Sequence, residues 1–179
     1  MKKALFILAL LLAPLASFSQ SGFFDSFEDE KDVTSVIVTK NMFKLLAEID
    51  IESKDKEVRD YMEMVNNLDN IKIFITENKE VGGRMKTSVE KYLNTAKGLN
   101  ELMRVKDDGK NIKFYSKPGK SESFVSELLM FLEGDVDGKD GTIIMSITGN
   151  IDLKQISKLT KDLKVPGSEE LKNIENKKG

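Results

Sequence analysis

The sequence predicts an α+β protein, in which a mainly antiparallel sheet of five to six strands carries about four helices packed largely on one face. The first observation is that the second half of the chain contains strand-like apolar segments separated by short turns rich in glycine and aspartate. Such a series of hairpins requires antiparallel pairing. The second observation is that the first half alternates β-branched segments with segments whose apolar residues recur at helical spacing.

The first half of the chain is predicted to contain two strands and three helices. In order, they are a strand at 36–38, helices at 40–49 and 54–68, a strand at 71–76 and a helix at 84–99. The strands are rich in valine and isoleucine, which favour the pleated conformation. The clearest helical signal is the apolar stripe of the second helix, formed by Val58, Tyr61, Met62, Val65 and Leu68. A glycine pair, Gly82-Gly83, predicts a break before the third helix.

The second half is predicted to form four consecutive strands and a final helix. The strands are expected at about 101–106, 112–115, 124–132 and 142–148. Asp108-Gly109 is a strong hairpin signal, and turns are also expected at 117–120 and 134–141. A capping box formed by Asp152 and Gln155 predicts the start of the last helix, which Pro166-Gly167 ends.

Residues 1–19 have the pattern of a cleavable signal peptide. Two lysines precede an uncharged, mostly aliphatic run at 4–16. A helix of that length spans roughly 20 Å, which is short of the ~30 Å hydrocarbon core of a bilayer. Small residues follow the run, so we expect cleavage between Ser19 and Gln20. The alternative, a buried core helix, does not explain the charged start and the small-residue end.

The rest of the chain is expected to be an exported protein of the periplasm or the extracellular medium. No cysteine follows the apolar run, which excludes the usual acylated lipoprotein, and no later stretch is long and apolar enough to span a membrane. We expect a flexible acidic leader at 20–34, a single α+β domain at 35–163 and a polar tail at 164–179. Without residues 1–19, 26 basic residues face 30 acidic ones, and a net charge of −4 argues against binding to nucleic acid or to an anionic membrane surface.

Four stretches of the sequence carry a resemblance to a known family. They are Ile71–Thr76 with the helix after it, Leu102–Val105, Asp108–Lys110 and the run from Ser126 to Leu153. As a set they resemble the family catalogued as domain of unknown function 4252. The resemblance implies a small exported protein of Bacteroidota-type bacteria, and it implies no catalytic residue because the family has no established activity. Some relatives are lipoproteins, and this chain departs from them by lacking the cysteine.

The amino-acid composition excludes several catalytic mechanisms. The chain contains no histidine and no cysteine, so a Ser-His-Asp triad, a cysteine nucleophile and a typical zinc site are impossible. General-base catalysis at neutral pH would require a perturbed glutamate, aspartate or lysine. We therefore assign no catalytic, cofactor-binding or metal-binding residue, and we expect no cofactor.

Three motifs fit an ordinary structural role better than chemistry. Two Ser-x-x-Lys pairs, Ser53 with Lys56 and Ser88 with Lys91, lie on predicted helices at the frequency that chance predicts. Backbone amides at Gly82-Gly83 are candidates for holding a phosphate, but no P-loop surrounds them. The loop at 135–141 resembles a calcium loop, but its spacing of acids is wrong, so an acidic hairpin turn is expected.

Two further features involve residues in apolar surroundings. Met62 and Met64 suggest copper(I) binding through thioethers, although methionine is also an ordinary filler of irregular cores. Glu127 lies in an apolar strand and is a candidate buried functional acid. The more common place for such a residue is a sheet edge or a solvated face.

These observations favour a non-enzymatic module that binds an envelope protein or a small ligand through its sheet or helix surface. The alternative is a carrier for a small apolar ligand or lipid, held in a cavity between sheet and helices and lined by Phe74, Phe114 and the methionines. An enzyme that uses carboxylates alone is ranked last, because it would require two or more acids converging in one pocket.

Overall fold

The computed structural model describes residues 21–49, 56–107, 109–121, 123–136 and 138–153. The helical segments are α2 (Ser21–Phe24), the 3-10 helix η1 (Asp25–Phe27), α3 (Lys40–Ile49), α4 (Lys56–Asn66) and α5 (Lys79–Thr95). The strands are β1 (Thr34–Thr39), β2 (Leu68–Thr76), β3 (Asn100–Asp107), β4 (Lys110–Pro118), β5 (Phe124–Val136) and β6 (Lys139–Asp152).

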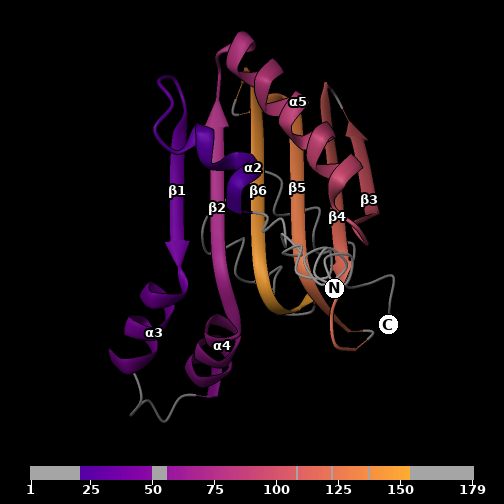
Figure 1. Cartoon of the computed structure of the whole chain (residues 1–179). Coiled ribbons are helices and arrows are strands. Elements are labelled where there is room, and N and C mark those ends of the chain that lie inside the picture. Colours follow the sequence, from indigo (N-terminus) through magenta and orange to yellow (C-terminus); the bar gives the residue numbers. More distant parts are fainter. Residues whose placement is uncertain (1–20, 50–55, 108, 122, 137, 154–179) are drawn as a thin grey trace, which may run out of the picture.

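The strands form one six-stranded sheet in the order β1-β2-β6-β5-β4-β3 (Figure 1). Every pair of neighbouring strands is antiparallel. Strands β3 to β6 follow one another as hairpins, and β6 then pairs with β2 from the first half of the chain. The α+β class and the antiparallel sheet predicted from the sequence are therefore confirmed.

The sheet is apolar on both of its faces. The face beneath α5, here called the α5 face, buries Phe74, Leu129 and Ile144 together with residues of that helix. The opposite face, here called the second face, buries a separate cluster that includes Phe114 and Met130. The two central hairpin strands supply both clusters because apolar residues follow one another without alternation along 128–132.

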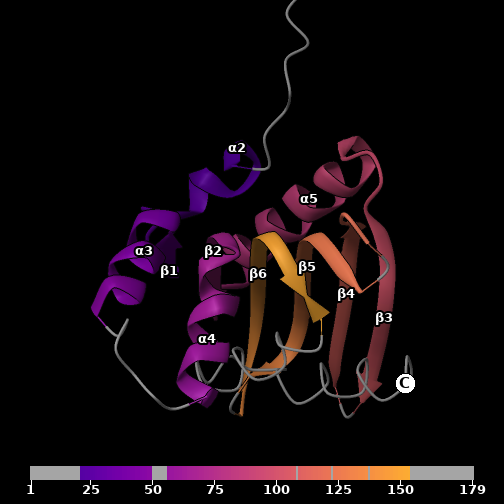
Figure 2. The ribbon, with the colours of Figure 1, turned by 90° about the horizontal axis from the view of Figure 1, so that it is seen from below.

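The helices are divided between these two clusters. Figure 2 shows α2 and α5 on the same side of the sheet. In contrast, Phe43 of α3 and Val65 of α4 pack in the cluster of the second face. This arrangement differs from the expectation that the helices lie largely on one face. A sheet with two apolar faces must be covered on both of them.

The segment expected to be a flexible acidic leader is helical from Ser21 to Phe27 and packs on the α5 face. Phe24 and Phe27 are only 1% and 2% exposed. The ring of Phe24 meets that of Tyr92 edge-on at a centroid distance of 5.5 Å. The leader differs from the expectation because its phenylalanines are part of the core, although they show no helical period in the sequence.

Helix α5 begins five residues earlier than predicted, at Lys79. Asn78 caps it, since the side-chain oxygen of Asn78 accepts hydrogen bonds from the backbone N–H groups of Glu80 and Val81. Gly82 and Gly83 therefore lie within the first turns of the helix. The prediction that the two glycines form a break before the helix was wrong, because the Asn78 cap outweighs the low helix propensity of glycine.

Three other boundaries differ from the sequence prediction. Leu68 is the first residue of β2 and not the last apolar residue of α4. The turn expected at 134–141 is shorter, because Gly134 pairs with Gly141 and Asp135 with Asp140. Asp152 is the last residue of β6, and the predicted final helix lies outside the described residues from 154 onward. Among the described residues, no helix is both long and apolar enough to cross a membrane.

Helix α5 packs closely against β6 at Gly82. A Cβ atom built on Gly82 would lie 2.5 Å from the Oγ1 atom and 3.3 Å from the Cβ atom of Thr142. A Cβ atom on the neighbouring Gly83 would meet nothing within 4 Å. The absence of a side chain at Gly82 therefore sets how closely the helix can pack on the sheet.

We expect Gly82→Ala to lower the free energy of unfolding by about 1–3 kcal/mol, because α5 or Thr142 must move to make room. The matched variant Gly83→Ala should leave the stability unchanged or raise it by up to ~1 kcal/mol, since alanine favours the helix and meets no neighbour there. Urea denaturation of both variants measures the difference. Equal effects of the two substitutions would contradict the close approach at Gly82.

Candidate functional site

The two edges of the sheet differ in how they are protected against pairing with another strand. At one edge lies β1, with the sequence TSVIVT, which contains no charged residue and no proline. It pairs with β2 in a regular register from Thr34 to Thr39. Exposed edge strands normally carry charges, proline or bulges that prevent further pairing. None of these features is present in β1.

The opposite edge, formed by β3, carries such protection. Its sequence NELMRVKD includes Glu101, Arg104 and Lys106. Glu101 and Arg104 form an ion pair at 2.6 Å. The register between β3 and β4 shifts between Glu101 and Met103, which interrupts the regular ladder at this edge. Strand β3 is thus guarded by charge and by an irregularity, and β1 is not.

The exposed apolar side chains of the described residues gather next to the unguarded edge. The four large apolar side chains that are clearly exposed there are Val36 (43%), Ile37 (39%), Met42 (47%) and Leu45 (56%). The first two belong to β1 and the last two to α3, which follows β1 directly and lies at its end in Figure 1. We call these four residues the β1–α3 surface. Single exposed apolar residues are ordinary, but here all four lie along one edge of the sheet, with Val36 and Ile37 on its opposite faces, so a contact that covers both of them must engage the edge itself.

A buried lysine ties the N-terminal segment to the strand beside this surface. Lys72 on β2 is 8% exposed and lies directly opposite Ile37 of β1. Its Nζ atom donates hydrogen bonds to Asp25 at 2.6 Å and to Glu28 at 2.5 Å. Burial alone would lower the pKa of the Lys72 ammonium, but these two carboxylates outweigh it and raise the pKa above its ordinary value. The charge is therefore retained, and it anchors η1 over the sheet.

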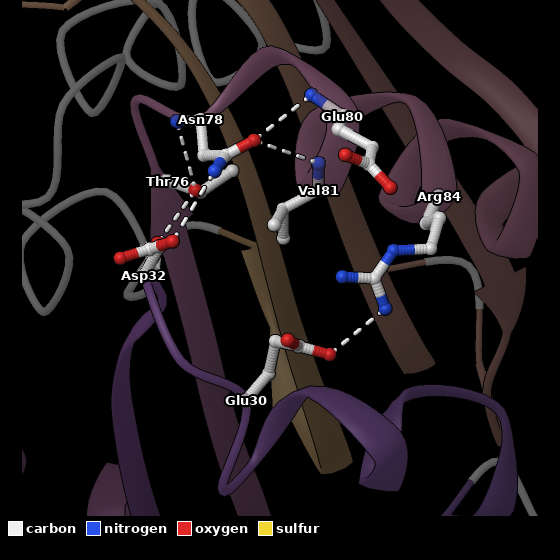
Figure 3. A network of polar contacts seen from close by, with 7 residues as sticks. All are labelled: Glu30, Asp32, Thr76, Asn78, Glu80, Val81 and Arg84. Atoms are coloured by element: carbon white, nitrogen blue, oxygen red, sulfur yellow. Dashed lines mark hydrogen bonds and ion pairs between the residues drawn. The ribbon is translucent and has the colours of Figure 1, made fainter.

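A network of polar contacts holds the segment between η1 and β1 against the start of α5 (Figure 3). The Thr76 hydroxyl donates to the backbone oxygen of Asp32 at 2.6 Å, and the Asn78 amide donates to the Asp32 carboxylate at 3.2 Å. Arg84 donates to Glu30 at 2.8 Å, and this hydrogen bond lowers the pKa of Glu30. The network fixes the chain just before β1, and so positions the edge strand.

The same network occupies backbone amides at the start of α5 that were candidates for holding a phosphate. The N–H groups of Glu80 and Val81 donate to the Asn78 side chain, and the N–H of Gly82 donates to the Asn78 backbone oxygen at 2.8 Å. These amides are therefore engaged within the protein. An open groove of about 520 Å³ lies beside them and is lined by residues that include Asp32 and Glu77, whose carboxylates disfavour an anion.

Glu127 is buried on a central strand and not at an edge or on a solvated face, so that part of the prediction was wrong. It is 5% exposed, and the Tyr92 hydroxyl of α5 lies 2.8 Å from both of its carboxylate oxygens. Burial raises the pKa of Glu127, and the hydrogen bond from Tyr92 and the charge of Lys117 only partly oppose this effect. Burial and the neighbouring Glu127 also raise the pKa of Tyr92.

Glu127 belongs to a polar row that crosses the α5 face of the sheet. Register places Thr148 of β6 opposite both Asn70 and Glu127, and Lys117 of β4 opposite Glu127. Directly opposite residues of an antiparallel sheet share a face, so these four side chains lie in line. The Asn70 side-chain oxygen is buried and has no hydrogen-bond partner among the described atoms. The row lies beneath the end of α5, where Tyr92 reaches Glu127.

The remaining candidates from the sequence do not form a site in the described residues. Ser88 and Lys91 both lie on α5, and Ser53 lies outside the described residues. Asp135 accepts a hydrogen bond from the N–H of Gly138 at 3.1 Å, which is a turn contact of the β5–β6 hairpin. In the part of the chain that the structure describes, no three or more acidic side chains come together in a way that could hold a metal ion.

The buried clusters show where Met64 of α4 and the two phenylalanines expected to line a carrier cavity lie. Met64 is buried at 5% exposure in the cluster of the second face. Phe114 belongs to the same cluster, whereas Phe74 belongs to the cluster of the α5 face. The sheet separates the two phenylalanines, so they cannot line one cavity. The register pairs Phe74 with Ile144 and Phe114 with Met130, and these pairings could not be read from the sequence because β2 and β4 are not neighbours in the sheet.

The fold and its surface define a small α+β protein with one guarded and one unguarded sheet edge. The chain belongs to the family described as Domain of unknown function (DUF4252), whose model matches residues 27–159. The match begins at Phe27, within the packed N-terminal segment. No curated protein and no solved structure matches the chain.

The raised pKa of Glu127 predicts a specific dependence of stability on pH. Above pH 4.5, the ordinary value, the unfolded chain releases this proton while the folded protein retains it, so stability falls as the pH rises through this window. Glu127→Gln is always neutral and still accepts the Tyr92 hydrogen bond. Its stability relative to the unchanged protein should therefore increase between acidic and neutral pH.

Urea denaturation over a series of pH values measures this effect. Glu90→Gln removes one carboxylate from the exposed side of α5 and is the matched control. In addition, Tyr92→Phe should destabilise the protein by about 1–3 kcal/mol, because the buried hydrogen bond from the Tyr92 hydroxyl to Glu127 is lost. A pH profile of Glu127→Gln that coincides with that of Glu90→Gln would show that the burial of Glu127 has no titration consequence.

Proposed function

We propose that the protein is an exported, non-enzymatic module that binds a partner protein through the β1–α3 surface. In this proposal the partner adds a strand to the outer edge of β1, and apolar groups of the partner cover Met42 and Leu45. The observation that carries the proposal is that all four clearly exposed large apolar side chains of the described residues lie on β1 and α3. Strand addition supplies affinity through main-chain hydrogen bonds and specificity through alternate side chains.

The contrast between the two edges supports this choice of surface. An edge with regular geometry, no charge and exposed valine and isoleucine is a ready template for pairing. The other edge carries Glu101, Arg104 and Lys106 and a register shift. Since the sequence guards β3 and leaves β1 open, we infer that β1 is kept open for a partner.

The chemistry of the described residues supports a non-enzymatic role. The most strongly buried acid, Glu127, is engaged by Tyr92 and is closed off from solvent, so it is not placed to meet a substrate. The ion cluster around Lys72 holds one segment of the chain against another. These polar groups therefore have structural partners within the fold.

The alternative of an apolar-ligand carrier has less support. A recess between α4 and the start of β5 has a volume of only about 60 Å³ and is lined in part by Glu63, Asn67 and Asn150. The open groove of about 520 Å³ beside the start of α5 is large enough, but its lining is mainly polar and includes Asp32 and Glu77. Pockets for small ligands usually enclose about 300–1,000 Å³ with mainly apolar walls. With Phe74 and Phe114 on opposite faces, the cavity expected for a carrier loses its two aromatic walls.

Position-resolved crosslinking in the native cell envelope tests the proposal. A photo-crosslinking amino acid at Ile37 should give a discrete adduct with a protein, whereas the same group at Lys106 on the guarded edge should not. Val36→Lys, which introduces a charge on β1, should abolish the adduct. Thr87→Lys places the same charge on the exposed side of α5 and should leave the adduct intact. Equal yields from positions 37 and 106, or no adduct at 37, would refute the proposed surface.

The N-terminus of the processed chain tests the proposed export. We expect the chain recovered from its native cells to begin at Gln20, because the apolar run at 4–16 is too short to remain in a bilayer. Intact-mass measurement of the protein from the envelope fraction determines the N-terminus. Ser19→Tyr, which places a large side chain at the expected cleavage position, should cause the precursor to accumulate. Recovery of the unprocessed chain with the cytosolic proteins would contradict export.

A further inference from the structure

We propose that the partner that adds a strand to β1 is a second copy of this chain, so that two sheets join through antiparallel pairing of β1 with β1. This inference rests on the proposed function and names the occupant of the same surface. A two-fold axis perpendicular to the sheet places each β1 strand antiparallel to its counterpart and keeps the α5 faces of the two copies on the same side. Such an interface is self-complementary, as a two-fold contact requires.

The charge distribution along the edge favours a second copy. At a two-fold axis a residue meets its own counterpart, so any charged residue in the centre of the strand would face a like charge. The strand from Thr34 to Thr39 contains no charge and is therefore free of this repulsion. The nearest charged residue after the strand is Lys40, and its Nζ atom lies 2.5 Å from the carboxylate of Asp69. That charge is already balanced within its own copy.

Strand β3 is less suited to self-pairing, because it carries exposed charges at its centre, although Arg104 is paired with Glu101 within its own copy. Its centre carries Arg104, whose side chain is 55% exposed, and Lys106 lies two residues away on the same strand. Pairing two copies of β3 would bring these cations close to their counterparts. The register shift between Glu101 and Met103 further disturbs the ladder that a second strand would need.

Register determines which side chains would meet across the axis. Opposite residues of an antiparallel pair share a face, so the two symmetric registers nearest the middle of the strand place Ile37 against Ile37 or Val36 against Val36. Ile37 lies opposite Lys72 and hence on the α5 face, whereas Val36 lies opposite Ile73 and hence on the second face. Pairing therefore covers one exposed apolar side chain on each face of the joined sheet.

The size of the contact sets the expected affinity. A ladder of six residues is small beside the total of about 1,600 Å² that a standard stable interface buries. Met42 and Leu45 extend the contact beyond the ladder, since α3 continues from the end of β1. We therefore expect a reversible dimer that forms in the micromolar range, and not an obligate one.

The absence of cysteine from the chain allows a direct test. In the purified chain without residues 1–19, Ile37→Cys and Val36→Cys are the probes, because in each of these two registers one of them lies directly opposite its own counterpart. Mild oxidation, or a short bismaleimide crosslinker, should give a covalent dimer with at least one of them. Lys106→Cys on β3 is the matched control and should remain monomeric under the same conditions.

Sedimentation velocity of the cysteine-free chain supplies a second measurement. Its weight-average mass should rise towards that of two copies between about 1 µM and about 1 mM. Val36→Lys should weaken association at least ~10-fold, and Thr87→Lys should leave it unchanged. Circular dichroism establishes that each variant is folded, which is expected because Val36 and Thr87 are both exposed.

The outcomes separate this inference from the proposed function. A monomer at every concentration, together with no dimer from either β1 cysteine, would overturn the second copy as the occupant. If the envelope crosslink at Ile37 then has the mass of a different protein, the binding surface stands with another partner. Dimers that form equally from Lys106→Cys would overturn the choice of β1 itself.

Discussion

The structure depends on a sheet whose central strands are apolar on both faces. In β5 and β6 the apolar residues do not alternate with polar ones, so neither face of the sheet can be left in water. The chain meets this requirement with two separate clusters, one shared with α5 and the N-terminal segment and one shared with α3 and α4. The placement of every helix in the described residues follows from the need to cover these two faces.

The N-terminal segment is held by a combination of apolar burial and charge. Phe24 and Phe27 fill space beneath α5, while Asp25 and Glu28 neutralise the buried ammonium of Lys72. Removing one member of a buried charge pair is costly because its partner is left without compensation. The acids that make the segment look like a solvated leader in the sequence are therefore part of what fixes it in place.

Local patterns allowed much of the fold to be predicted. The Asp108-Gly109 hairpin, the alternation of Ile71, Ile73 and Ile75, and the β-branched β1 are short-range signals, and each corresponds to an element of the sheet. The boundaries that failed depend on tertiary contacts. Gly82 fits inside α5 because Asn78 caps the helix and Thr142 lies close by, and neither effect is visible in the glycine pair alone.

The candidate site was harder to predict because it is defined by what surrounds it. Nothing in the sequence TSVIVT states that the strand lies at an edge, since the order β1-β2-β6-β5-β4-β3 is a property of the whole sheet. Glu127 was singled out, but its burial depends on Tyr92, which lies 35 residues earlier and on another element. In both cases the residue type was visible and the neighbour was not.

The unequal edges of the sheet have a consequence for polymerisation. In the proposed dimer joined through β1, the outer strands of the combined sheet, as the described residues form it, would be the two β3 strands. These carry charges and an irregular ladder, so they do not accept a further copy. Growth would therefore terminate at the pair, so that a protein with an open strand at one end would avoid the endless stacking of a fibril.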